Sequence, residues 1–493
     1  MRCFIISTCL LLSGCIQGPD FKRPDFAGLF TKTFKHGSAS SSAPPAVSPD
    51  EWWKLYHKQQ LNSFVEEAIR SNADLQAAEA RVKIARAVVG GRRADWFPKL
   101  NSTSSFGTQR FSASAFGANL PAEFGDLSSL LERDFYRSSL DLSYEVDLWG
   151  KVRRSVESGK AGQQSAQDTL SAQRLSLAAE VCRHYFLWQS LNDQAGILQQ
   201  TLSLRHEAVA LQSARLKKGL GPESDLARAK TEYDFAEADL ESVKRQRGSA
   251  ANALAVLCGK SPASFHLHSD ALPTEPPPIA AGMPSTLLQS RPDVRSAEHR
   301  LRAANAEIGV AKAEFFPAFS LLGSGGLDAV KSQDFLVWQN RVLSMGPSLT
   351  LPVFQGGRLR AGLQMAYVRE EEAQAAYKQT IIEALREVED ALLDLKSYAL
   401  WHRALLSAHQ NAVTAADLSR LRHQKGLASY FEVLDAERTV LTARLLVSQA
   451  KGQRLNASVQ LAKAIGGGWT GAGRPTAIVN EHQTATKSIT PMP

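Results

Sequence analysis

The sequence predicts a mixed α/β membrane protein built from two copies of one unit, each with two β-strands and a very long helix. Three observations predict this fold class. An internal repeat covers most of the chain, a nine-residue segment alternates between apolar and polar residues, and two long stretches contain no proline and little glycine. Two such units make up the body of the chain.

The composition of the 493-residue chain is 44% hydrophobic and 22% charged, with a formal net charge of +8. These values exclude a disordered chain and a disulfide-stapled miniprotein. The one notable apolar run lies near residue 10 and is too short to span a bilayer, which excludes a helical multi-pass membrane protein. Basic blocks with interleaved aromatic residues are missing from the sequence, so we expect no nucleic acid partner.

The amino terminus has the features of an export signal. Arg2 is followed by an apolar run, which ends in Leu12-Ser13-Gly14-Cys15. This ending resembles a bacterial lipoprotein signal, with 1–14 as the signal peptide and Cys15 as the lipidated first mature residue. The lipid would attach the chain to a membrane without a transmembrane helix. The alternative is a plain signal peptide with an incidental cysteine.

The body of the chain contains an internal sequence repeat. Residues 68–107 and 287–326 align at an offset of 219 with 13 of 40 positions identical, and the offset becomes 207 further on. The change places 12 extra residues between 107 and 140, where we expect a surface loop. The predicted segments are a lipidated tail (15–60), repeat 1 (61–260), a Pro-rich linker (261–284), repeat 2 (285–468) and a loose tail (469–493).

Each repeat begins with a helix, predicted at 61–93 and 287–313, which ends before Pro98 or Pro317 and leads into a strand. After the second strand, a helix of about 67 residues extends to Lys217 in the first copy, and its counterpart extends to Lys425. Glycines then break both helices, and returning helices follow.

The second strand of the first copy is predicted at 140–148, where Leu140, Leu142, Tyr144, Val146 and Leu148 alternate with polar residues. The counterparts in the second copy are Leu349, Leu351 and Val353. Carboxylates on the polar face argue against a sandwich core and fit an outward-apolar, inward-polar membrane strand. Four such strands cannot close a barrel, and open edges are forbidden in lipid, so several chains must share one barrel.

The chain also carries a set of short motifs in a fixed order. They are Cys15 with 18–24, Trp52-Trp53, 72–75, 291–294 with Ala297-Glu298, 304–311, 315–317, 351–354 with 356–358, 432–438 and 466–469. Together, inside a duplicated chain, they resemble the TolC-like outer-membrane factors of tripartite efflux pumps, in the lipoprotein branch.

This resemblance implies a homotrimer with a shared 12-stranded outer-membrane β-barrel, continued by a long periplasmic α-helical barrel. Such proteins are passive exit ducts for small molecules such as drugs and toxic compounds. The expected partners are an inner-membrane pump of RND type, a periplasmic adaptor and outer-membrane lipid. No enzymatic activity, cofactor or metal site is expected. The alternatives are a type I protein-secretion duct and a structural coiled-coil outer-membrane lipoprotein without transport.

The resemblance also implies a periplasmic gate just after the second helix turn. Its residues are Phe431, Glu432, Asp435 and Arg438, with Asp225 and Arg228 at the equivalent places of the first copy. In a trimer, three copies of each carboxylate would surround one narrow axis and attract cations. Glu432 and Asp435 could instead be solvated acids at a helix start, stabilised by the helix dipole.

The helix turns resemble the tips that meet the adaptor in this family. The residues implied are Arg215, Lys218, Gly219 and Leu220 in the first copy, and Arg422, Lys425, Gly426 and Leu427 in the second. Ordinary turn chemistry explains the glycines equally well. Cys182 and Cys258 are predicted at similar heights on antiparallel helices, so a disulfide between them is a further hypothesis.

Overall fold

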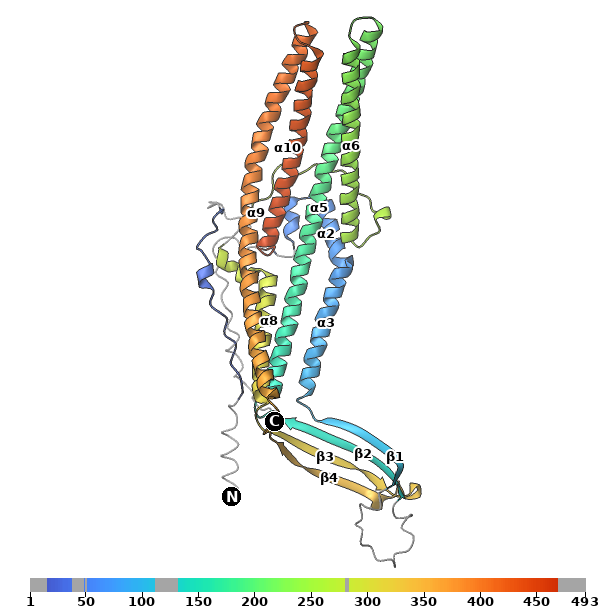
Figure 1. The fold of residues 1–493 in the computed structure, drawn as a ribbon, viewed down its shortest axis with the longest axis vertical. Helices are drawn as coiled ribbons and strands as arrows, with labels where there is room; N and C mark the ends of the chain where they lie inside the picture. Colours follow the sequence, from blue (N-terminus) through green and yellow to red (C-terminus); the bar gives the residue numbers. More distant parts are fainter. Residues whose placement is uncertain (1–15, 38–47, 49–50, 111–131, 280–282, 469–493) are drawn as a thin grey trace, which may run out of the picture. The chain divides into compact units, whose positions relative to one another are not determined.

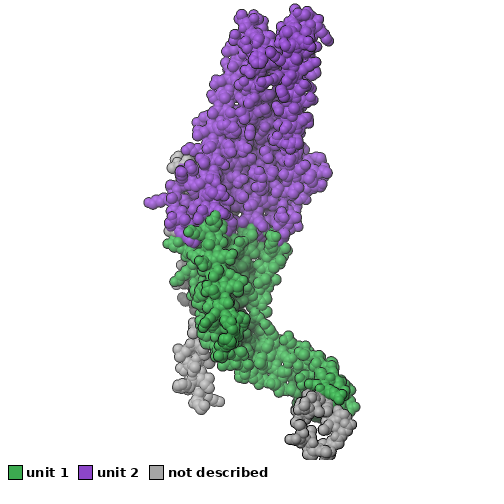
Figure 2. Space-filling model, in the orientation of Figure 1, with its two compact units in different colours: residues 1–25, 78–169, 295–380 green, residues 26–77, 170–294, 381–493 purple. Residues whose placement is uncertain are grey.

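The computed structural model describes residues 16–37, 48, 51–110, 132–279 and 283–468. Cys15, the predicted signal peptide, most of the predicted surface loop and the whole of the predicted C-terminal tail lie outside these residues. The chain divides into two compact units (Figure 2). Unit 1 comprises Met1–Asp25, Ala78–Thr169 and Arg295–Thr380, and unit 2 comprises Phe26–Ala77, Leu170–Val294 and Ile381–Pro493. Each unit therefore contains parts of both predicted repeats.

The same order of elements occurs twice along the chain (Figure 1). The first series is α2 (Gln59–Ser71), α3 (Ala73–Ala94), β1 (Lys99–Arg110), β2 (Glu132–Val146), α5 (Lys151–Lys217) and α6 (Glu223–Leu257). The second series is α7 (Leu287–Ser290), α8 (Pro292–Ala313), β3 (Ala318–Ala329), β4 (Arg341–Thr350), α9 (Arg358–Gln424) and α10 (Tyr430–Ala464). Both long helices have 67 residues and both returning helices have 35.

The prediction of one continuous first helix in each copy is wrong. Asn72 is extended between α2 and α3, and its Oδ1 accepts a hydrogen bond from the Leu75 N–H (3.1 Å), as an N-cap does. Arg291 is extended between α7 and α8, because the following Pro292 disfavours the helical conformation at the preceding residue. An asparagine cap thus interrupts the predicted helix of the first copy, and a proline interrupts that of the second copy at the equivalent position.

Unit 2 has a hydrophobic core around the short helix η2 (Trp52–Tyr56). The side chains of Trp52, Tyr185 and Phe186 are fully buried there, and the Tyr56 hydroxyl lies 2.7 Å from the Ser458 Oγ. Cys182 and Cys258 belong to the same core as free thiols, so the hypothesis of a disulfide between them is wrong. Burial raises the pKa of both thiols, that of Cys258 to about 11.

Unit 1 contains a four-stranded antiparallel sheet in the order β1-β2-β3-β4. Leu142 lies opposite Leu100 of β1 and Gly323 of β3, and Gly323 lies opposite Met345 of β4. Since residues directly opposite share a face, this register separates the sheet into two faces.

One face is mainly apolar and carries Leu100, Phe106, Tyr136, Leu140, Leu142, Tyr144, Val146, Phe319, Leu321, Leu327, Leu343, Met345 and Leu349, with Ser102, Ser104, Thr108, Arg110, Glu132, Asp134, Ser138 and Arg341 as polar exceptions. The other is mainly polar and carries Asn101, Thr103, Ser105, Arg137, Ser139, Asp141, Ser143, Ser320, Ser324, Asp328, Ser344, Ser348 and Thr350, with Phe135, Leu322 and Val342 as exceptions. On the polar face the Asp141 carboxylate accepts from the Ser324 hydroxyl at 2.6 Å. The two-faced strand predicted from the alternation is thus present.

The predicted ends of two strands are wrong. β2 ends at Val146, and the Asp147 carboxylate accepts hydrogen bonds from the N–H groups of Val152 and Arg153 (both 3.0 Å) at the start of α5. β4 ends at Thr350, so Leu351 and Val353 lie outside it. Within the described residues no strand pairs with the outer edge of β4, so nothing holds its continuation in a ladder.

Among the helices of the described residues, none combines the length and apolarity needed to cross a membrane.

Two glycines of unit 2 pack closely against the ends of α2 and α7, where the first helix of each repeat is interrupted. Gly259 and Gly466 follow α6 and α10 with φ of 68° and 97°, and a Cβ on either would lie 2.6 Å from the carbonyl oxygen of Ser71 or Ser290. The backbone therefore passes too closely for any side chain, besides having a conformation that favours glycine.

We predict that Gly466→Ala lowers the free energy of unfolding by about 2 kcal/mol, because strain and a steric clash act together. Gly248→Ala is the control, since it lies inside α6 with no atom within 4 Å of the added Cβ, and it should be neutral or stabilising. The measurement is the thermal midpoint of helical circular dichroism in detergent. Equal midpoints for both variants would contradict the close approach.

Candidate functional site

The two helix tips of unit 2 have the same backbone geometry. The Leu220 N–H donates to the Arg215 carbonyl (2.8 Å), and the Leu427 N–H donates to the Arg422 carbonyl (2.9 Å). Gly219 and Gly426 turn the chain with φ of 70° and 73°. This is the glycine-terminated helix end that leaves few orphan carbonyls.

The predicted adaptor-contact residues differ in what they do within the chain. The guanidinium groups of Arg215 and Arg422 reach the carbonyl oxygens of Leu220 (3.5 Å) and Leu427 (3.4 Å), so both arginines stabilise their own turns. The side chains of Lys218 and Lys425 are exposed, and the leucines are 65% and 67% exposed. Each tip thus presents one lysine and one leucine to solvent.

The predicted gate residues lie at the start of α10. The Ser429 Oγ accepts from the Glu432 N–H (3.3 Å) and the Glu432 carboxylate accepts from the Ser429 N–H (3.5 Å), which forms a capping box. Arg422 lies 3.6 Å from the same carboxylate. Glu432 therefore acts as a helix-start acid, whatever else it does.

The other gate candidates are arranged in different ways. The Arg228 guanidinium of α6 lies 5.2 Å from the centre of the Phe431 ring, a cation–π contact between the two hairpins. Asp435 is exposed on α10, and Asp225 lies half-buried in the first turn of α6. Arg438 forms an ion pair with Glu232 of α6.

A network of charges joins all four long helices near the tips. We call it the tip network, and it comprises Arg205 (α5), Glu232 (α6), Arg420 (α9), Glu437 and Arg438 (α10). Arg205 lies between the carboxylates of Glu232 (3.6 Å) and Glu437 (3.5 Å), and Arg420 donates to Glu437 at 3.0 Å. Cations and carboxylates thus alternate from one hairpin to the other.

Arg205 is the central residue of the tip network, because its side chain is only 5% exposed. A buried guanidinium is tolerated only beside compensating charge. The nearby Tyr430 has a raised pKa, mainly through burial and further through the Glu437 carboxylate, while the positive charge of Arg205 acts in the opposite direction.

Sequence reasoning missed Arg205, Glu232, Arg420 and Glu437. A signal was present, since Arg205 follows Ala195, Leu198 and Leu202 at the spacing of one apolar helix face. A charged residue on such a stripe indicates a buried ion pair or a junction between helices.

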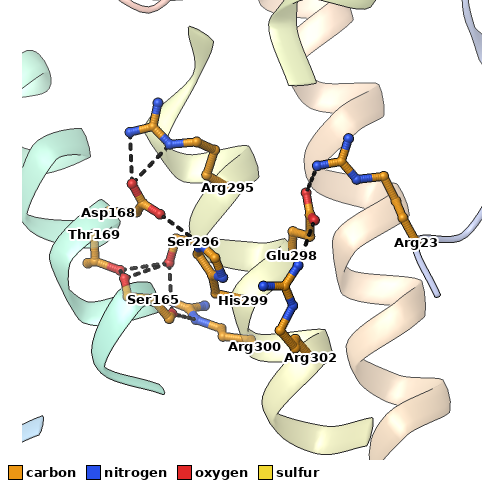
Figure 3. A network of polar contacts seen from close by, with 10 residues as sticks. All are labelled: Arg23, Ser165, Asp168, Thr169, Arg295, Ser296, Glu298, His299, Arg300 and Arg302. Atoms are coloured by element: carbon orange, nitrogen blue, oxygen red, sulfur yellow. Dashed lines mark hydrogen bonds and ion pairs between the residues drawn. The ribbon is translucent and has the colours of Figure 1, made fainter. Parts of the chain in front are cut away.

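A second polar cluster lies in unit 1 between α5, α8 and the N-terminal segment (Figure 3). The Asp168 carboxylate accepts two hydrogen bonds from Arg295 (2.8 and 3.0 Å) and lies 3.4 Å from the His299 Nε2. Beside it, the buried Glu298 carboxylate accepts from Arg23 at 2.5 Å and lies 3.7 Å from Arg302. Within the described part of the chain, no group of three or more His, Cys, Asp or Glu side chains could hold a metal ion.

We predict that Arg205→Met opens or loosens the tips. It leaves Glu232 and Glu437 facing one another without the shared cation, which should destabilise the tip by roughly 3 kcal/mol. The measurement is single-channel conductance in planar bilayers, which should increase relative to the native protein. Arg245→Met, an exposed arginine of α6, is the matched control and should leave conductance unchanged. A native-like Arg205→Met channel would contradict a closing role of the network.

We further predict a pH dependence from His299. Burial lowers the pKa of His299, although Asp168 acts in the opposite direction, so the folded chain binds a proton less readily than the unfolded chain. The stabilisation that comes from keeping His299 neutral is complete above about pH 6.5, the pKa of histidine in the unfolded chain. It is lost as the pH falls from there through the lower pKa of His299 in the folded chain.

The thermal midpoint should therefore fall less between pH 8 and pH 5 in His299→Gln than in the native protein. Burial also lowers the pKa values of His184 and His402, and the comparison of the two proteins cancels their contributions. Identical slopes would contradict the assignment to His299.

Comparison with known proteins identifies the family. The family model described as outer membrane efflux protein matches residues 64–260 and 283–467. Outer membrane protein OprJ of Pseudomonas aeruginosa is 32% identical over 468 residues, which cover 93% of this chain and 94% of OprJ. The toluene efflux pump outer membrane protein TtgC of Pseudomonas putida is 30% identical over 474 residues, which cover 94% of each chain.

Solved structures agree in fold. The outer-membrane channel OprN has a TM-score of 0.82 at 30% identity and matches 92% of this chain and 100% of its own. The open state of the MtrE outer membrane channel of Neisseria gonorrhoeae has a TM-score of 0.77 at 28% identity, with 92% and 98% covered. The resemblance predicted from the motifs is thus confirmed, and the chain belongs to the outer membrane efflux protein family.

Proposed function

We propose that this chain is the passive outer-membrane exit duct of a tripartite efflux system. It moves small molecules such as drugs and toxic compounds from an inner-membrane pump of RND type and a periplasmic adaptor to the exterior. The relatives named for toluene and solvent efflux support this class of cargo. The single observation that carries the proposal is the two-faced sheet of unit 1, with one apolar face, one polar face and two open edges.

The sheet supports a shared barrel in the outer membrane. Its apolar face extends from Val146 to Tyr136 along β2. These ten steps correspond to about 33 Å along the strand, or about 23 Å of membrane thickness at a 45° tilt, close to the ~25 Å apolar band of outer-membrane barrels. Three copies would supply 12 strands, and the polar faces would line an aqueous lumen. The protein is in this proposal a homotrimer.

The N-terminal segment supports lipid anchoring at Cys15. The Gln17 N–H donates to the Trp149 carbonyl (3.0 Å) just beyond β2, and Arg154 holds Asp20 at 2.7 Å. Gln17, two residues after Cys15 in the sequence, thus lies just beyond the end of β2, and this supports a lipid on Cys15 that enters the bilayer.

The helix tips support a gate and an adaptor site. In a trimer, three copies of Phe431, Glu432 and Asp435 would surround the axis. Opening separates the two hairpins of each chain, so it must break the Arg438–Glu232 ion pair and the Arg228–Phe431 contact. The exposed lysine and leucine of each tip remain available for the periplasmic adaptor.

The sheet argues against a structural lipoprotein without transport, because such a protein needs no two-faced strands. The type I secretion alternative is less favoured, since the relatives are named for efflux pumps.

Single-channel conductance tests the proposal on the mature protein. The native trimer should pass little current, and Glu432→Ala with Asp435→Ala should pass several-fold more, because removing the ring of carboxylates weakens the closed state. Asp435→Ala alone should retain most of the gain, since the Glu432 carboxylate is already engaged by the Ser429 N–H and by Arg422.

Ser429→Ala is the matched control, because it removes the capping box but keeps both acids. If Ser429→Ala raises conductance as much as the double variant, helix fraying explains the effect and the gate assignment fails. If neither the native protein nor any variant conducts, the duct itself is contradicted.

A further inference from the structure

The polar face of the sheet in unit 1 contains a hollow of about 530 Å³ that crosses all four strands. The residues of the polar face that line it include Asn101, Asp141, Ser143, Leu322, Ser324 and Ser344. The other lining residues are neighbours of these along the strands. The volume lies within the range of roughly 300–1,000 Å³ that is typical of small-molecule sites.

A glycine and an exposed leucine shape the apolar part of the hollow. Gly346 of β4 also lines it and lies opposite Leu322 of β3, so both residues belong to the polar face. A Cβ added at Gly346 would have no atom within 4 Å, and the Leu322 side chain is 46% exposed. The sheet thus leaves open space beside an apolar side chain, on a face that is otherwise mainly polar.

Asp141 of β2 supplies the charge of the hollow. Its carboxylate accepts hydrogen bonds from the Ser324 hydroxyl (2.6 Å) and the Ser139 hydroxyl (3.1 Å). These bonds orient the carboxylate, and because both donors are neutral they leave its negative charge in place. An ionised carboxylate has about four acceptor positions, so it retains the capacity to accept from a ligand.

The charge of Asp141 is not compensated by a neighbouring cation. The Asp328 carboxylate of the same face accepts two hydrogen bonds from the Arg137 guanidinium (2.6 and 3.1 Å), and Lys99 at the start of β1 pairs with Asp95 at 3.0 Å. Among the residues that the structure describes, no basic side chain forms an ion pair with Asp141. The hollow therefore carries a net negative charge.

These features select one class of ligand. A protonated amine matches the Asp141 carboxylate, and an adjoining apolar group matches Leu322 and the open space at Gly346. The hydroxyls of Ser143 and Ser344 can exchange further hydrogen bonds with polar atoms of the ligand. An anion would be repelled by the carboxylate, and a purely apolar molecule would remove water from the carboxylate without replacing its hydrogen bonds.

We propose that this hollow is a transit site for small cationic amphiphiles, in which Asp141 binds the ammonium group and Leu322 contacts the apolar part. The site rests on the proposed duct, because cargo reaches the hollow only if the polar face lines the lumen. The hollow is open to solvent, so binding is weak and release is fast. Conduction through a pore requires both properties.

Block of single-channel current by phenylethylamine tests the site. The recordings use the mature protein with Glu432→Ala and Asp435→Ala, because the carboxylates at the helix tips would otherwise attract the same cation. Phenylethylamine is protonated at neutral pH and should reduce the current with a half-blocking concentration in the millimolar range. Phenylacetate, which has a similar shape and the opposite charge, should have no effect at the same concentrations.

Two substitutions in this background address the two parts of the site. Asp141→Asn removes the charge and keeps the size of the side chain, and Gly346→Leu fills the space beside Leu322. Each should raise the half-blocking concentration of phenylethylamine roughly five-fold or more. Only channels that insert and conduct are recorded, so a misfolded variant cannot imitate a loss of binding, and Asp141→Asn alone decides if Gly346→Leu gives no channels.

Two matched controls lie on the same face outside the hollow. Asp328→Asn removes the same charge, and Ser348→Leu introduces the same side chain as Gly346→Leu two residues further along β4. Both should change the half-blocking concentration less than about two-fold.

The outcomes separate the site from the duct. Channels that conduct but are blocked equally with and without the Asp141 carboxylate overturn the site and leave the duct intact. Equal effects of Asp141→Asn and Asp328→Asn, with none from Gly346→Leu, reveal only the general charge of the lumen and also overturn the site. If none of these proteins conducts, the duct and the site that depends on it are both overturned.

Discussion

The backbone hydrogen bonds of a four-stranded sheet with two open edges set the constraint on which the rest of this structure depends. In lipid, an unpaired N–H or C=O group costs several kcal/mol, and water cannot replace the missing partner. Within the described residues, no strand pairs with the outer side of β1 or β4. In the proposed homotrimer, these two edges would be paired between copies of the chain.

Buried charged side chains in the helical regions are likewise held beside oppositely charged partners. Where helices from different parts of the sequence meet, buried charges occur in compensated groups. Glu298 lies between Arg23 and Arg302, Asp168 lies beside Arg295, and Arg205 lies between two carboxylates. Such groups contribute little net stability compared with apolar packing, but they penalise every arrangement in which one partner moves away. In the proposed gate, this property would favour the closed arrangement of the two hairpins without making it permanent.

Much of the fold could be predicted from the sequence, and the successes share one cause. Strand alternation, helix-ending prolines and glycine turns are local signals, and the repeat allowed each to be read twice. The helix break at Asn72 was missed, because a single side-chain cap is a weak signal inside a long periodic segment. The true end of β4 was missed because it depends on an edge that the chain itself does not cover.

The tip network could not be predicted from the sequence, for a different reason. Which residue of α5 faces which residue of α10 depends on helical phase accumulated over 67 residues. A straight helix drifts by about 20° per heptad against a 3.5-residue repeat, so small errors in pitch decide the partner. The motif match therefore singled out Glu432 and Arg438 but could not assign the Ser429 cap or the Glu232 partner.

The burial of the two core thiols has a chemical consequence for a protein made for an oxidising compartment. Thiol–disulfide exchange proceeds through the thiolate. Burial raises the pKa of Cys258 to about 11 and raises that of Cys182 as well, so both groups are neutral thiols at pH 7. The core around Trp52, Tyr185 and Phe186 thus shields both free thiols of the folded chain from disulfide exchange.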